Sequence, residues 1–141
     1  NTAYGVEAKA LAAKDPDIIF TDMLKGRLKW GAFYGCEAFV LPSHQENFGI
    51  AVVEALACGK PVLISDQVNI WREIENQGGG LVNKDSLEGA EQLLLQWCNL
   101  DKEQKYLKGR EALATYQKHF TVEEAAKKMA EALKLKNECD A

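Results

Sequence analysis

The sequence predicts an α/β fold built on a doubly wound parallel sheet. Two mainly apolar runs, a continuous one at 38–42 and a second at 61–65, are typical of strands that are buried on both faces. Segments with helical periodicity alternate with these runs, as they do in βαβ units. The composition is also globular, because 47% of the residues are apolar and 27% are charged. A length of 141 residues corresponds to one domain.

Local signals predict each element in the first two thirds of the chain. Residues 2–14 are rich in alanine and end before Asp15-Pro16, which predicts a helix that stops there. The β-branched segment 17–21 predicts a short strand. Further helices are predicted at 28–36, 49–58 and 69–76, and further strands at 38–42, 61–65 and 81–82.

The last third contains only predicted helices, which we expect to be additions that cover the sheet. Asp85 with Glu88 and Thr121 with Glu124 have the spacing of capping boxes, and a further helix spans 102–119. Two of these helices carry apolar residues at helical spacing, which predicts buried faces. The predicted faces consist of Leu87, Ala90, Leu94 and Trp97 in one helix, and of Ala125, Met129 and Leu133 in the other.

Charge and cysteine content exclude several classes of function. The net charge of -4 argues against a nucleic acid or an anionic membrane as the main partner. The four cysteines show neither Cys-x-x-Cys nor zinc-ligand spacing. Cys36, Cys58 and Cys98 lie among apolar residues, so we expect free thiols in the core and a reducing, cytoplasmic location.

The loop after the strand at 38–42 is the candidate binding site, because ligands of such sheets bind at the carboxyl ends of the strands. Gly49 opens the following helix. The backbone N–H groups of Phe48, Gly49, Ile50 and Ala51 are therefore expected to be free and to point out of its first turn. A helix N-terminus of this kind suits a phosphate group.

Two carboxylates flank this anion site. Glu46 lies in the loop ahead of the helix, and Glu54 lies inside the helix. Because a carboxylate beside a phosphate is favourable when it accepts hydrogen bonds from neutral hydroxyls, the pattern indicates a nucleotide-diphosphate sugar. The alternative is that Glu46 is a solvated loop residue and Glu54 a surface helix residue.

Glu46 and Glu54 resemble the Glu-x7-Glu motif of the retaining "group 1" glycosyltransferases, which have the GT-B fold. The surrounding sequence is similar to that family over nearly the whole chain. The segments that carry the resemblance are 39–43, 46–49, 54–62, 65–66, 79–82 and 119–123. Two positions depart from the family pattern, namely Asn47 and Thr21-Asp22, where the family often has glycine. Asp22 either alters nucleotide choice or is a turn residue.

The resemblance implies a reaction and a set of residue roles. The reaction is hexosyl transfer, with retention of configuration, from a nucleotide-diphosphate sugar to a glycan, lipid or small-molecule acceptor, without a metal or a cofactor. Glu46 would be the catalytic residue and contact the transferred sugar, Glu54 would bind the ribose hydroxyls, and Phe20 would meet the base. The implied donor-binding residues are Glu46, Asn47, Phe48, Gly49, Ile50, Glu54 and Phe20.

The resemblance also implies that residues 1–141 form part of a C-terminal nucleotide-sugar-binding domain that is truncated on its N-terminal side. Two strands, the cations that follow the first of them, and the acceptor-binding N-terminal domain would be absent. We therefore expect an incomplete sheet that exchanges strands or forms oligomers, and an isolated chain without transferase activity. Peripheral membrane association, if present, would be through the absent domain.

Two alternatives have the same size and fold class. A non-catalytic nucleotide-sugar or partner-binding module would use the same residues without turnover. A receiver-type signalling domain is disfavoured, because Lys60-Pro61 precedes a strand here, whereas in receivers such a pair follows one. We expect Trp30, Trp71 and Trp97 to be core residues, with Trp71 the one closest to the carboxyl edge. His44 is expected to be either an acceptor contact or a solvated loop residue, and His119 a surface residue.

Overall fold

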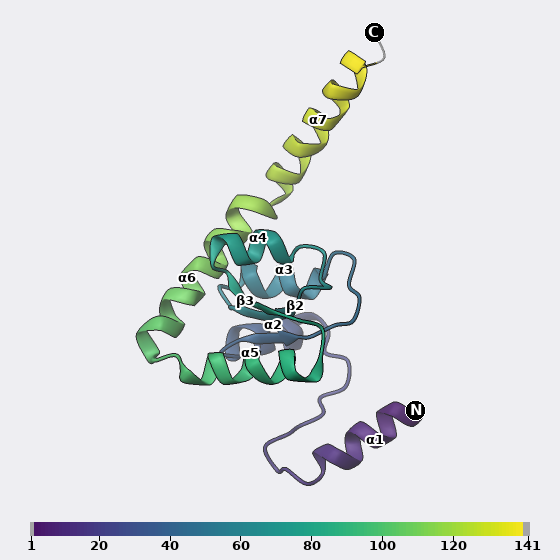
Figure 1. Ribbon diagram of the computed structural model, residues 1–141, viewed down its shortest axis with the longest axis vertical. Helices are drawn as coiled ribbons and strands as arrows, with labels where there is room; N and C mark the ends of the chain where they lie inside the picture. Colours follow the sequence, from purple (N-terminus) through teal and green to yellow (C-terminus); the bar gives the residue numbers. More distant parts are fainter. Residues whose placement is uncertain (1, 140–141) are drawn as a thin grey trace. The chain divides into compact units, whose positions relative to one another are not determined.

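The computed structural model describes residues 2–139, with side chains up to residue 133. The chain divides into two compact units, of which the first ends at Gly31 and the second begins at Ala32. In chain order the elements are α1 (Ala3–Ala12), α2 (Gly26–Gly35), β1 (Phe39–Leu41), α3 (Ile50–Ala57), β2 (Val62–Ser65), α4 (Trp71–Gln77), β3 (Gly80–Asn83), α5 (Leu87–Asn99), α6 (Lys102–His119) and α7 (Val122–Cys139) (Figure 1).

The second unit contains a parallel sheet with the strand order β1-β2-β3. Phe39 pairs with Val62, and Val62 pairs with Gly80, so the three strands start in register. Helix α3 connects β1 to β2, and α4 connects β2 to β3, as expected for two successive βαβ units. The predicted parallel α/β fold is therefore confirmed.

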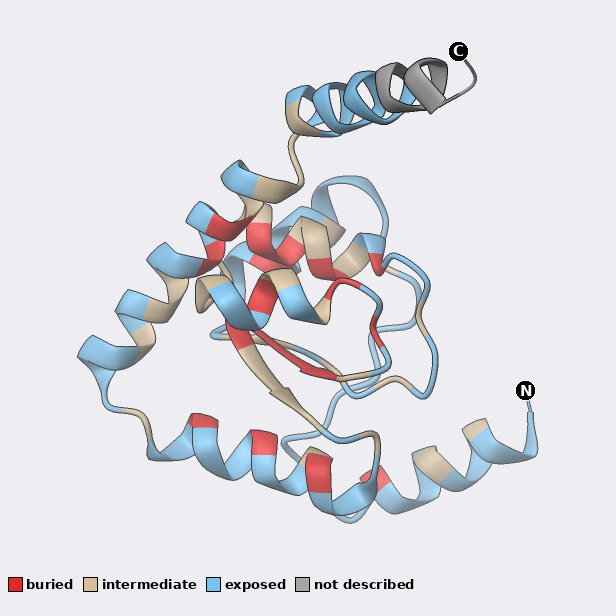
Figure 2. Cartoon of the chain, turned by 45° about the horizontal axis from the view of Figure 1, so that its top comes forward, coloured by how far each residue is buried: buried red, intermediate tan, exposed pale blue. Residues whose placement is uncertain are grey.

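Helices cover both faces of this sheet, because alternate residues of β2 pack against different helices. Val62 and Ile64 belong to a core cluster with residues of α3, α4 and α6. Leu63, between them, packs instead with Leu93 and Trp97 of α5. All four residues of β2 are buried, which explains why the strand is apolar up to its last residue, Ser65 (Figure 2). The sheet is doubly wound, as predicted.

The predicted strand at 17–21 is wrong. This segment has no strand conformation, and Ile18, Ile19 and Phe20 are 53%, 78% and 52% exposed. A strand exists only where a neighbour completes its backbone hydrogen bonds, and no strand among residues 2–139 pairs with it. Asp22 adopts a φ of 53°, a left-handed conformation that aspartate tolerates, which fits its interpretation as a turn residue.

The start of α5 differs from the predicted capping box by one residue. Ser86, rather than Asp85, is the N-cap, and its Oγ accepts a hydrogen bond from the Gly89 N–H at 3.0 Å. The buried residues of α5 are Gly89, Leu93 and Trp97, so the predicted face is only partly correct. By contrast, one half of the predicted capping box at Thr121 is confirmed, because its Oγ1 accepts from the Glu124 N–H at 3.3 Å. The reciprocal bond to the Glu124 side chain is absent among the described residues.

Several predicted core positions are exposed. In α7 the apolar residues Met129 and Leu133 are 68% and 60% exposed, and α6 is the principal neighbour of this helix. Trp30 is 40% exposed. Cys98 is also exposed, because it lies about 100° around α5 from the buried Trp97.

The burial of the cysteines and of His119 differs in part from the prediction. Cys36 and Cys58 are half-buried, while the side chain of Cys139 lies outside the described residues. His119 is half-buried rather than on the surface, and its Nε2 is buried without a hydrogen-bond partner among the described residues. None of the helices in the described part of the chain has the length and apolarity needed to cross a membrane.

Candidate functional site

The loop between β1 and α3 ends in a tight turn that places a carboxylate at the helix N-terminus. Gly49 is the N-cap of α3 and adopts a φ of 69°, which favours glycine. A Cβ at this position would lie 3.1 Å from Val52 Cγ2 and 3.4 Å from Glu46 Cγ. Glu46 is half-buried, and its Oε1 accepts a hydrogen bond from the Gly49 N–H at 3.2 Å. The turn therefore orients the Glu46 side chain.

The backbone of Glu46 is held by the loop that follows β2. Its N–H donates to the Gln67 carbonyl at 3.2 Å, and its carbonyl accepts from the Asn69 N–H at 3.0 Å. This short parallel bridge lies beside Val68, which is fully buried. Glu46 is thus fixed at both the main chain and one carboxylate oxygen, while Oε2 makes no hydrogen bond to any described residue.

The other predicted donor-binding residues of the second unit surround this turn. Gly49 is buried, whereas Asn47, Phe48 and Ile50 are exposed. The Phe48 ring meets the Phe120 ring edge-on, with centroids 6.3 Å apart. Glu54 is half-buried on α3, about one turn beyond the first helical residue.

Two predictions about the site need correction. The Gly49 N–H is not free, because Glu46 already accepts its hydrogen bond. The N–H groups of Ile50 and Ala51 do lack an acceptor among the described residues. Phe20 lies in the first unit, where its ring centroid is 5.6 Å from the Lys9 ammonium. It is not on a strand, and its contact with a base stays a prediction.

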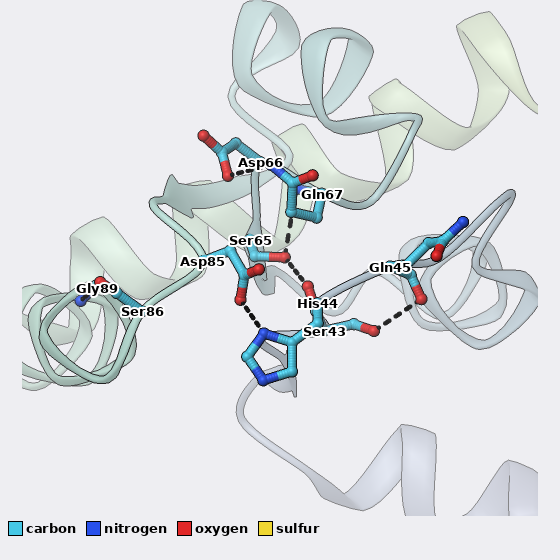
Figure 3. Close-up of polar contacts among 9 residues, drawn as sticks. All are labelled: Ser43, His44, Gln45, Ser65, Asp66, Gln67, Asp85, Ser86 and Gly89. Carbon is cyan, nitrogen blue, oxygen red and sulfur yellow. Dashed lines mark hydrogen bonds and ion pairs between the residues drawn. The ribbon is translucent and has the colours of Figure 1, made fainter.

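A polar network joins the carboxyl ends of all three strands (Figure 3). The fully buried Ser65, the last residue of β2, donates its hydroxyl hydrogen bond to the Ser43 carbonyl in the loop after β1. The next residue of that loop, His44, places Nδ1 2.6 Å from Asp85 Oδ1 beyond the end of β3. The His44 side chain is 91% exposed, and its contact with Asp85 was not predicted. Its role, as an acceptor contact or as a solvated loop residue, stays a prediction.

A second ion pair borders a small cavity at the same edge. Lys84 Nζ lies 2.8 Å from Asp66 Oδ2. The hydrogen bond from Lys84 lowers the pKa of Asp66, and the same contact raises the pKa of Lys84. Both residues line a cavity of about 240 Å³ together with Trp71, Glu75, Val82 and Asn83. Trp71 is thus partly core and partly cavity wall, as its place after β2 suggested.

Sequence reasoning missed Lys84, although one signal was present. Lys84 directly follows β3, just as Asp66 directly follows β2, and residues in such positions share one edge of a parallel sheet. The separation of 18 residues hides the pairing from local patterns. In chemical terms, this edge combines an oriented carboxylate, two free N–H groups at a helix N-terminus and one cation neutralised by Asp66.

Two curated proteins are similar to parts of the chain. The first is N,N'-diacetylbacillosaminyl-diphospho-undecaprenol alpha-1,3-N-acetylgalactosaminyltransferase of Campylobacter jejuni, which is 46% identical over 46 residues, or 33% of this chain. The second is an uncharacterized glycosyltransferase of Methanocaldococcus jannaschii, 28% identical over 85 residues, or 57% of this chain. The matched regions span only 12% and 22% of these relatives.

Among solved structures, one with a similar fold aligns with almost the entire chain. It is sucrose-phosphate synthase from Thermosynechococcus elongatus, with a TM-score of 0.75 and 19% identity over 97% of this chain and 35% of that one. The family model described as "Glycosyl transferases group 1" matches residues 14–114, a stretch that includes β1, the Glu46 loop, α3 and the other two strands. Because that match spans more than half of the 141 residues, the chain belongs to the group 1 glycosyltransferases.

Proposed function

We propose that this chain provides the donor-binding half of a retaining glycosyltransferase that takes a hexosyl group from a nucleotide-diphosphate sugar. Residues 1–141 would then form part of a C-terminal domain, and the acceptor would bind to a separate N-terminal domain. The observation that carries the proposal is the hydrogen bond between Glu46 and Gly49, because it orients a carboxylate at the N-terminus of α3.

The geometry of this turn suits a ligand that carries both hydroxyls and a phosphate. With Oε1 bound to Gly49, Oε2 is the free acceptor for a sugar hydroxyl. The N–H groups of Ile50 and Ala51 are donors for an adjacent phosphate, and the positive end of the α3 dipole favours its charge. Glu54, farther along α3, would accept from the ribose hydroxyls.

In this role Glu46 holds the transferred sugar beside the phosphate that leaves with the nucleotide. The main chemical requirement of such a transfer is stabilisation of the negative charge that develops on the leaving diphosphate. The helix N-terminus contributes to that stabilisation without reorganising, since its N–H groups are already fixed. Lys84 is neutralised by Asp66 in this structure, so we assign it no role in charge stabilisation.

Titration of the 141-residue chain with UDP-glucose, GDP-mannose and ADP-glucose tests the proposal. At least one of them should shift the backbone amide NMR signals of residues 46–51. Glu46→Gln should weaken that binding about tenfold, because an amide loses the charge-assisted hydrogen bond to the sugar. The fold should persist, since the glutamine carbonyl still accepts from Gly49. Glu91→Gln, at an exposed position of α5, is the matched control.

The outcomes separate the alternatives. If none of the three nucleotide-sugars binds, or if Glu46→Gln binds as well as Glu91→Gln, the proposed donor site is wrong. In the full-length protein, Glu46→Gln should abolish turnover. If the full-length protein shows no turnover, and Glu46→Gln still weakens its binding of the nucleotide-sugar, the protein is instead a non-catalytic binding module.

A further inference from the structure

A second and larger cavity lies at the amino ends of the strands. Its volume is about 550 Å³, which is within the usual range for small-molecule sites. Its lining includes Cys36 and Glu37, which precede β1, and Lys60 and Pro61, which precede β2. The end of α5 and one face of α6 also line it, with Trp97, Lys102, Lys105, Tyr106 and Arg110 among their residues.

This cavity is distinct from the Glu46 site. The strands are parallel, so the residues before β1 and β2 share one edge of the sheet, and the loops that follow these strands share the opposite edge. The four residues of β2 separate the two edges by roughly 13 Å, at about 3.3 Å per residue. A ligand of one site therefore does not occupy the other.

A contact between two glycines brings cations from different elements together. Gly59 lies in the turn between α3 and β2, and a Cβ on Gly109 of α6 would be only 3.0 Å from its carbonyl oxygen. Helix α6 therefore packs directly on the backbone of that turn. Lys60 follows Gly59 and Arg110 follows Gly109 in the sequence, and both side chains line the cavity.

The charge of the lining is strongly positive, although the chain as a whole carries a net charge of -4. Four cations, Lys60, Lys102, Lys105 and Arg110, face a single carboxylate, Glu37. Glu37 is already bound to Lys105 at 3.1 Å, a contact that lowers the pKa of Glu37. The Lys105 ammonium also lies 5.1 Å from the centroid of the Trp97 ring.

Three cations are therefore left without a counter-charge. Among the described residues, the side chains of Lys60, Lys102 and Arg110 make neither an ion pair nor a hydrogen bond. Like charges held together in a concave site repel one another, and a bound anion relieves that repulsion. The aromatic and apolar lining residues, Tyr106, Pro61 and Leu113, add a surface for an uncharged ring.

We propose that this cavity binds a phosphorylated small molecule, with its phosphate against Lys60, Lys102 and Arg110 and its ring against Tyr106. Arginine suits a phosphate because its planar fork donates two parallel hydrogen bonds. The site is separate from the proposed donor site and does not depend on it. Sugar phosphates and nucleoside monophosphates share this chemistry, and the experiment distinguishes them.

Titration of the 141-residue chain with glucose 6-phosphate and with adenosine 5′-monophosphate, followed by amide NMR, tests the proposal. At least one of them should shift the signals of Gly59 and Gly109, while glucose and adenosine should not. Arg110→Glu should weaken the binding at least tenfold. Arg110→Lys should weaken it less, because lysine keeps the charge but loses the fork that donates two parallel hydrogen bonds. Lys127→Glu on α7 is the matched control, because it makes the same change in charge at another exposed helical position.

Three results would overturn the proposal. The first is the absence of shifts at Gly59 and Gly109 with either phosphorylated compound at millimolar concentration. The second is an equal loss of affinity in Arg110→Glu and Lys127→Glu, which would indicate a general charge effect. The third is a set of shifts confined to residues 46–51, which would support the donor site and leave the amino-edge cavity unused. A thermal unfolding curve for each variant confirms that the fold is retained.

Discussion

At the scale of single residues, the conformation of Gly49 controls the position of Glu46. The positive φ of Gly49 turns the chain so that its own N–H points back at the carboxylate three residues earlier. The sequence alone predicted that Gly49 begins a helix, but not that the Gly49 N–H donates a hydrogen bond to Glu46. That contact depends on the turn geometry, which many loop sequences of similar composition do not adopt.

Gly49→Ala should destabilise the second unit and displace Glu46. The left-handed φ and the close approach to Val52 predict a loss of about 1–2 kcal/mol in the free energy of unfolding. Urea denaturation measures this loss, and nucleotide-sugar titration measures the accompanying loss of affinity. Gly31→Ala is the control, since a Cβ there meets nothing within 4 Å. A similar change in the free energy of unfolding of both variants would show that alanine fits the Gly49 turn without strain.

The Asp66–Lys84 ion pair should contribute to the stability of the folded protein in a way that depends on pH. The pKa of Asp66 is lowered on folding, so its contribution is present above about pH 3.9 and is lost as the pH falls through the lowered value. The pKa of Lys84 is raised, so its contribution is present below about pH 10.4 and is lost as the pH rises through the raised value.

Lys84→Met should therefore lower the melting temperature slightly between about pH 4 and pH 10, with the difference disappearing in acid and in alkali. Thermal unfolding monitored by circular dichroism across this range is the measurement. Lys127→Met should show no such pH profile. A deficit of constant size down to about pH 2, where both proteins still fold, would contradict a contribution from this ion pair.

At the scale of elements, the sequence predicted the strands best where burial is complete. The first three residues of β2 are apolar because both faces of the strand are covered, and its last residue, Ser65, is buried with its hydroxyl bonded to the Ser43 carbonyl. Segment 17–21 has an equally strand-like composition, yet it remains irregular because strand formation requires a neighbour that composition does not reveal. The start of α5 was predicted one residue too early, because Ser86 rather than the adjacent Asp85 caps the helix.

Ser86→Ala should destabilise α5 more than Asp85→Ala does. Loss of the hydrogen bond to the Gly89 N–H predicts a cost of about 1 kcal/mol in the free energy of unfolding. Asp85 makes its contact with the highly exposed His44, so its removal should cost less. Chemical denaturation of the two variants provides the comparison. A larger effect for Asp85→Ala would favour the capping box that the sequence suggested.

The buried face of α5 gives a second test at this scale. Leu93 is 1% exposed against β2, whereas Leu94 is 48% exposed. Leu93→Ala should therefore cost about 2–5 kcal/mol, through lost burial and the cavity left behind. Leu94→Ala should cost much less. If the two variants had equal unfolding midpoints in urea, the face assigned to α5 would be wrong.

At the scale of the whole molecule, the second unit presents different chemistry at the two edges of one sheet. The carboxyl edge carries an oriented carboxylate and a helix N-terminus, and this edge was predicted from the order of strands and loops alone. The amino edge carries the positive cavity, whose residues come from segments as far apart as Cys36 and Leu113. Its formation depends on the packing of α6 on the turn at Gly59, which no local pattern encodes.

The hydrogen bond from Ser65 to the Ser43 carbonyl has a consequence for dynamics. It belongs to a closed set of contacts. The loop after β1 is tied to the loop after β2 at Ser43 and Glu46 and to the segment after β3 at His44, and Asp66 and Lys84 tie the latter two segments together. Amide protons in the three segments should therefore exchange with solvent in one cooperative opening rather than independently. Ser65→Ala would uncouple them, so that the exchange rates of Glu46 and Asn69 rise while those within β2 stay protected.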